Sequence, residues 1–122
     1  MQFARDKIVL VVEDDPDLRG LYRTALRAAG YAVFAVEDGV DALQYVEQTV
    51  PAAIVLDLGL PRLNGRDVQQ EMAAHDGTRN IPIIVVTGEA HNLDERNFTC
   101  VLRKPVEPEA VVEAVQNCLR SR

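Results

Sequence analysis

Short apolar runs alternate along the chain with segments in which apolar residues recur at helical spacing. The runs at 8–12, 52–56 and 83–86 contain only Ile, Val, Leu and Ala, which is typical of strands buried on both faces of a sheet. Two further strands are predicted at 31–36 and 100–102. Strands separated by helical segments indicate an α/β fold with a parallel sheet.

Helix boundaries are marked by capping residues. Asp15 is a predicted N-cap, Pro16 fits the first helical position, and Gly30 ends the apolar pattern. Three more helix starts are predicted, at Asp38-Gly39, at Asn64-Gly65 and after Pro108. Because crossovers between parallel strands are almost always right-handed, the carboxyl ends of the strands should meet at one edge.

The segment between the last two predicted strands is short. About twelve residues, from Gly88 to Thr99, connect them, which is near the minimum of roughly 10 to 12 for such a crossover. Only Leu93 and Phe98 in this segment are strongly apolar, and five of its residues are poor helix formers, namely Gly88, Asn92, Asp94, Asn97 and Thr99. The fourth helix is therefore predicted to be short or irregular, with at most two turns, and to be anchored by Leu93 or Phe98.

Polar residues follow four of the predicted strands directly. Glu13 and Asp14 follow the first, Asp57 follows the run at 52–56, Thr87 follows the fourth, and Lys104 lies just past the fifth. At a shared sheet edge these residues would bring together three carboxylates, one hydroxyl and one ammonium. Such a set suits a divalent cation beside a phosphoryl group.

Simpler roles exist for several of these residues. Acidic residues after a strand often only cap a helix, which would explain Asp15 and Asp17. Thr87 could be an ordinary strand residue and Lys104 a surface lysine. The two histidines, His75 and His91, lie in polar loop sequence without ligand-like spacing, and we assign them no phosphotransfer role.

Composition favours one domain. The 122 residues are 48% hydrophobic without a compositional break, which predicts a single domain over 1–122 with its core at about 7–120. Net charge is 13 minus 19, or −6, and no basic run is present, so direct nucleic-acid binding is not expected. There is no apolar run near the roughly 18 residues of a membrane span. With two cysteines in apolar patterns, a cytoplasmic protein without membrane contact is expected.

Six ordered segments carry a family resemblance. They are Val11–Pro16, Asp38–Leu43, Asp57–Pro61, the stretch from Pro61 through Asn64-Gly65, Pro82–Gly88 and Lys104-Pro105. In this order they resemble, over essentially the whole chain, the receiver domain of two-component response regulators, including the chemotaxis regulators. The resemblance implies a doubly wound, flavodoxin-like sheet of five parallel strands in the order 2-1-3-4-5, with helices on both faces.

The resemblance also implies roles for the strand-end residues. Asp57 would accept a phosphoryl group from a histidine kinase or a histidine phosphotransfer protein, with Thr87 and Lys104 as partners of the phosphoryl oxygens. The domain would catalyse only its own phosphorylation and dephosphorylation, and its surface would then act on a downstream protein target. The expected Mg²⁺ ligands are Asp14, Asp57, the Gly59 carbonyl and, through a water, Glu13.

Three details are specific to this chain. Val101 stands where many receivers have Tyr or Phe, so an aromatic rotamer switch cannot operate. Glu89, two residues past Thr87, is predicted to affect dephosphorylation more than phosphorylation. The resemblance further implies a cis peptide bond between Lys104 and Pro105.

Two other function classes are open on the sequence alone. A haloacid-dehalogenase-type phosphatase also uses an aspartyl nucleophile and Mg²⁺, but it needs a second Asp at the position of Gly59. A receiver that works without phosphate would be a constitutive interaction module. The presence of Asp57, Thr87 and Lys104 argues against that module.

Overall fold

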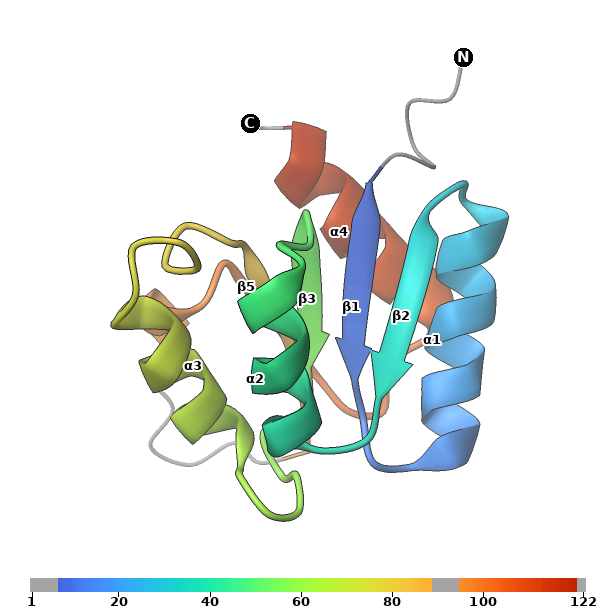
Figure 1. Ribbon diagram of the computed structural model, residues 1–122. Helices are drawn as coiled ribbons and strands as arrows, with labels where there is room; N and C mark the ends of the chain where they lie inside the picture. Colours follow the sequence, from blue (N-terminus) through green and yellow to red (C-terminus); the bar gives the residue numbers. More distant parts are fainter. Residues whose placement is uncertain (1–6, 89–94, 121–122) are drawn as a thin grey trace.

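A central sheet of five parallel strands is covered by helices on both faces (Figure 1). The computed structural model describes residues 7–88 and 95–120. The strands are β1 (Ile8–Val12), β2 (Ala32–Val36), β3 (Ala53–Leu56), β4 (Ile83–Thr87) and β5 (Cys100–Arg103). The helices are α1 (Pro16–Ala28), α2 (Gly39–Gln48), α3 (Gly65–Ala73) and α4 (Pro108–Arg120). The strand order β2-β1-β3-β4-β5 confirms the predicted fold.

Alternate residues of the strands build two separate cores. Leu10, Ile54 and Val85 pack on the side of α2 and α3, whereas Val9 and Val55 pack on the side of α1 and α4. The central strands β1, β3 and β4 are therefore buried on both faces, which is why their sequences are almost continuously apolar.

Side-chain caps fix where the first three helices begin. Asp15, Asp38 and Asn64 each accept backbone N–H groups from the first turn of α1, α2 and α3. Gly30 follows α1 with φ 102, a conformation that favours glycine. These boundaries agree with the predicted ones, and each cap lies at the same sheet edge as the polar strand ends.

The segment between β4 and β5 contains a single 3₁₀ turn, η2 (Glu95–Asn97), in its described part. Residues 89–94, with Leu93 and Glu89, lie outside the described residues. Phe98, one of the two predicted anchors, packs against the core on the α2 and α3 side. Within residues 95–99 the prediction of a short or irregular helix is confirmed.

No helix among the described residues is long and apolar enough to cross a membrane. Cys100 and Cys118 are both half-buried, and neither forms a disulfide.

Candidate functional site

Three carboxylates meet at the carboxyl edge of the sheet. Glu13 and Asp14 follow β1 and Asp57 follows β3, and one oxygen from each lies within 4.8 Å of the others. Glu13 and Asp57 are buried, whereas Asp14 is exposed to solvent. The predicted acidic cluster is thus present, and it is open on the side of Asp14.

Backbone pairing places these residues. Val12 and Leu56 are partners in the parallel register of β1 and β3, so the residues that follow them lie side by side. The Asp57 N–H donates to the Val12 carbonyl at 3.0 Å, and the Glu13 N–H donates to the Val36 carbonyl at 3.1 Å. The backbones of Asp57 and Glu13 are therefore held by the sheet itself.

Lys104 connects the two buried carboxylates. Its Nζ lies 3.1 Å from Glu13 Oε1 and 3.5 Å from Asp57 Oδ2. The Lys104 N–H donates to the carbonyl of Thr87 at 2.9 Å, and the Lys104–Pro105 peptide bond is cis, as predicted. Thr87 itself is fully buried at the end of β4. All five predicted side chains therefore lie at the ends of neighbouring strands.

Burial and charge shift the acid–base properties of this cluster. Burial raises the pKa of Glu13 to about 7; the N–H of Asp15 opposes this shift, and the negative charge of Asp57 adds to it. Burial lowers the pKa of Lys104, but the hydrogen bond to Glu13 and the charge of Asp57 outweigh burial, so the net direction is upward. Lys104 is therefore held as a cation between two acids.

The donor set fits a hard divalent cation. All the ligand atoms are carboxylate oxygens, which Mg²⁺ and Ca²⁺ prefer. With all three carboxylates ionised and Lys104 protonated, the cluster carries an excess of two negative charges, which one divalent cation would neutralise. The Gly59 N–H donates to Asp57 Oδ1 at 3.2 Å, and the role of the Gly59 carbonyl as a ligand stays a prediction.

The loop after Asp57 is held by contacts that the sequence did not reveal. Arg62 adopts φ 63, and its guanidinium pairs with Asp38 at 2.6 Å and with Asp41 at 3.2 Å. The N–H of Asp41 and then the Arg62 guanidinium hold the pKa of Asp38 below its usual value. The partners are more than 20 positions apart, so no local pattern could have indicated this bridge.

Gly65 brings the start of α3 against the backbone of the site. Its N–H donates to the Leu58 carbonyl at 2.9 Å. A Cβ at this position would lie 2.5 Å from the Asp57 carbonyl oxygen and 2.7 Å from Leu58 Cα. Only glycine allows the helix to approach so closely, so Gly65 fixes the position of Asp57 from behind.

A second unpredicted residue is Tyr22, whose side chain on α1 is 1% exposed. Among the described residues its hydroxyl has no hydrogen-bond partner. Burial raises the pKa of this phenol, and the negative charge of Glu13 adds to the shift, so the ring lies within the field of the site.

We expect Tyr22→Phe to raise the free energy of unfolding by about 1 kcal/mol, because it removes a buried polar group and keeps the ring. Urea denaturation measures this change. Tyr31→Phe, at a half-buried position, is the matched control and should change the stability by less than about 0.5 kcal/mol. A loss of stability in Tyr22→Phe alone would show that the hydroxyl makes a favourable hydrogen bond.

Comparison with known protein families shows which family the chain belongs to. Residues 9–116 match the model of the response regulator receiver domain. The chain belongs to this family. Receiver domains are signalling domains of two-component systems, they interact with histidine kinases, and they are not classical enzymes.

Curated relatives support the assignment. The transcriptional regulatory protein BaeR of Escherichia coli O6:H1 is 37% identical over 117 residues, covering 92% of this chain and 48% of BaeR. The DNA-binding response regulator MtrA of Mycolicibacterium smegmatis is 33% identical, covering 92% of this chain and 50% of MtrA. The receiver domain thus spans about half the length of these two relatives. Protein Rrf1 of Nitratidesulfovibrio vulgaris is 32% identical and is covered to 81%.

Solved structures give the same result. The receiver domain of the sensor histidine kinase PA1611 from Pseudomonas aeruginosa, solved with a magnesium ion in its active site cleft, superposes with a TM-score of 0.84. It is 30% identical, and the match covers 93% of this chain and 98% of that one. The response regulator TrrA of Thermotoga maritima, in complex with Mg²⁺ and BeF, has a TM-score of 0.83 at 26% identity, with 93% and 99% covered.

Val101, the residue predicted to replace an aromatic side chain, lies in β5. Val101 pairs in register with Val85 of β4 and packs against the core on the α2 and α3 side. Its branched aliphatic side chain has no ring to rotate, so the predicted absence of an aromatic switch follows from residue type. The predicted role of Glu89 falls outside the described residues.

Proposed function

We propose that this receiver domain accepts a phosphoryl group on Asp57 from the phosphohistidine of a sensor kinase or of a histidine phosphotransfer protein. One observation carries the proposal. Two carboxylates of the acidic cluster lie beside the Lys104 ammonium, Glu13 at 3.1 Å and Asp57 at 3.5 Å, and Asp57 is the more exposed of the two, at 7% against 2%. A nucleophile between an anionic metal-binding set and a cation is the arrangement that phosphoryl transfer needs.

The chain's own residues would act in three ways. An oxygen of Asp57 attacks phosphorus, the N–P bond to the donor histidine breaks as the O–P bond forms, and the histidine leaves with the electron pair of the broken bond. Lys104 would offset charge on one phosphoryl oxygen, and the Thr87 hydroxyl would donate to another. The same site would later admit water for hydrolysis of the aspartyl phosphate.

Magnesium is the proposed cofactor. It would be held by Asp14, Asp57 and the Gly59 carbonyl, with Glu13 acting through a water, and when bound it would neutralise charge on the transferred group. The magnesium ion in the cleft of the PA1611 receiver domain supports this choice. The oxygen-only donor set of this chain supports it independently.

We propose that phosphorylation changes a protein-binding surface of a cytoplasmic domain that contacts neither a membrane nor nucleic acid directly. The net charge of −6 supports the absence of direct nucleic-acid contact. MtrA is named as DNA-binding, but this chain matches only half of MtrA.

Phosphate incorporation tests the proposed function. We expect treatment with acetyl phosphate and Mg²⁺ to add one phosphate per chain, as measured by intact mass, and chelation of the metal to reduce the rate at least tenfold. The linkage of an aspartyl phosphate is a base-labile acyl phosphate, so the added mass should disappear on mild alkaline treatment. A folded protein that incorporates no phosphate under any of these conditions would favour the phosphate-independent interaction module.

A further inference from the structure

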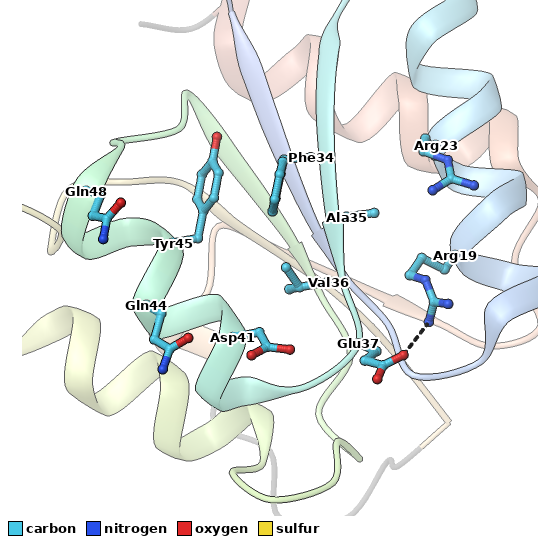
Figure 2. Close-up of a pocket in the computed structure, with 10 residues that line it drawn as sticks. All are labelled: Arg19, Arg23, Phe34, Ala35, Val36, Glu37, Asp41, Gln44, Tyr45 and Gln48. Atoms are coloured by element: carbon cyan, nitrogen blue, oxygen red, sulfur yellow. Dashed lines mark ion pairs between the residues drawn. The ribbon is translucent and has the colours of Figure 1, made fainter.

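The edge of the sheet at β2 borders a wide groove that takes no part in the proposed phosphoryl transfer. Figure 2 shows the groove, with α1 on one side of the strand and α2 on the other. Its volume is about 660 Å³. Arg19 and Arg23 of α1 line one wall, and Phe34 of β2 with Tyr45 of α2 lines the other.

Backbone groups of β2 point into this groove. Among the described residues, β2 pairs only with β1. The Ala32 N–H donates to the Lys7 carbonyl and the Val36 carbonyl accepts from Glu13, each at 3.1 Å. In a parallel ladder alternate residues bond to the same neighbour, so the N–H and C=O groups of Val33 and Ala35 face away from β1.

The sequence of β2 contains none of the residues that usually protect a sheet edge against strand addition. Natural sheets protect their edges with proline, charged residues or bulges. The sequence of β2 is Ala-Val-Phe-Ala-Val, without any of these features, and its register with β1 is unbroken. Phe34 is 49% exposed and stacks on Tyr45 with ring centroids 4.6 Å apart. An apolar platform therefore lies beside unpaired backbone groups.

The two walls of the groove select different side chains. An added strand would present alternate side chains to opposite faces of the sheet. One row would lie over the Phe34 and Tyr45 rings and should be apolar. The other row would face Arg19 and Arg23, so its side chains should be acidic. The Arg19 side chain is 20% exposed, and Arg23 is half-buried. The Arg19 guanidinium donates to the Glu13 carbonyl at 2.9 Å and pairs with Glu37 at 3.9 Å, so Arg23 is the cation with more freedom to bind.

We propose that β2 binds an extended segment of a partner protein, with alternating acidic and apolar residues, as a sixth strand of the sheet. A second copy of this chain fits less well. Antiparallel pairing of two β2 strands about a two-fold axis keeps equivalent faces on the same side, so it would bring the Arg19 and Arg23 walls of both copies together. Like charges brought together in this way disfavour self-pairing.

The proposal is tested with the whole chain and designed peptides. The probe is a fluorescein-labelled nine-residue peptide that alternates Glu with Val or Phe, and a peptide of the same composition with its order scrambled is the control. We expect the alternating peptide to bind with a dissociation constant below about 100 μM by fluorescence anisotropy, and at least about tenfold more tightly than the scrambled one. Amide shifts in the NMR spectrum should centre on Val33 and Ala35.

Two variants separate backbone pairing from charge attraction. Ala35→Pro removes an outward N–H at an edge position, where proline is tolerated, and should weaken binding at least about tenfold. Arg23→Glu should weaken binding of the Glu-containing peptide to a similar extent and shift the preference toward peptides without acidic residues. Thr24→Ala, at an exposed position on α1, is the matched control and should change nothing. Thermal melts confirm that each variant is folded.

Three results would overturn the proposal. They are equal binding of the ordered and scrambled peptides, no binding of either peptide up to about 1 mM, and concentration-dependent dimerisation that Ala35→Pro abolishes. The last of these results would show that β2 pairs with a second copy of the chain. Asp57→Asn should leave peptide binding intact, so failure of the proposed phosphorylation and failure of this inference are distinguishable.

Discussion

Asp57→Asn is expected to reduce phosphate incorporation from acetyl phosphate by at least about a thousandfold. The amide has the same shape and still offers an oxygen to the Gly59 N–H, but it cannot act as a nucleophile. Glu13 is not expected to replace it, because Glu13 is only 2% exposed and its Oε1 pairs with Lys104 at 3.1 Å. Intact mass after incubation with Mg²⁺ measures the effect.

Asp14→Asn is the matched control for this substitution. Asp14 is exposed and belongs to the proposed metal site, but it is not the proposed acceptor. We expect the rate to fall by roughly ten- to a hundredfold, with part of the loss recovered at higher Mg²⁺. Equal incorporation by Asp57→Asn and wild type, with the modified peptide elsewhere, would show that Asp57 is not the acceptor.

The second large effect is expected from Gly65→Ala. We predict a decrease of about 3 kcal/mol or more in the free energy of unfolding, because the new Cβ would lie 2.5 Å from the Asp57 carbonyl oxygen. Backbone atoms on both sides prevent an easy adjustment. The protein that remains folded should also phosphorylate more slowly, since relief of the clash displaces Asp57. Urea denaturation and the phosphorylation rate measure the two effects.

Gly20→Ala is the control, since it makes the same chemical change in the interior of α1. A Cβ at Gly20 would meet nothing within 4 Å. Alanine is favoured over glycine within a helix by about 1 kcal/mol, so this variant should be more stable than wild type. If both variants changed stability equally, the close approach at Gly65 would not matter for the fold.

Much of the fold could be predicted from local patterns. The apolar runs located β1, β3 and β4 because those strands are buried on both faces, and Asp15, Asp38 and Asn64 marked helix starts because they cap free N–H groups. The site followed from the same logic, since parallel strands place their final residues along one edge.

Other features depend on contacts between residues far apart in the sequence, which local patterns do not indicate. The bridge from Arg62 to Asp38 spans 24 positions. The ion pair between Glu13 and Lys104 could not be predicted either, because the sequence does not show how deeply Glu13 is buried. The run at 31–36 looks like the other strands, and only the position of β2 at the sheet edge leaves Phe34 exposed. The strand order that creates this edge came from the family resemblance.

Lys104 has one further consequence, because a single ammonium serves both Glu13 and Asp57. A divalent cation that neutralised the carboxylates would weaken their hold on the ammonium and leave it more available to an arriving phosphoryl group. The two events are then thermodynamically linked. The factor by which the cation favours formation of the aspartyl phosphate must equal the factor by which the aspartyl phosphate tightens retention of the cation. Sharing one positive charge between two acids would thus make the site respond to both proposed occupants as a cooperative unit.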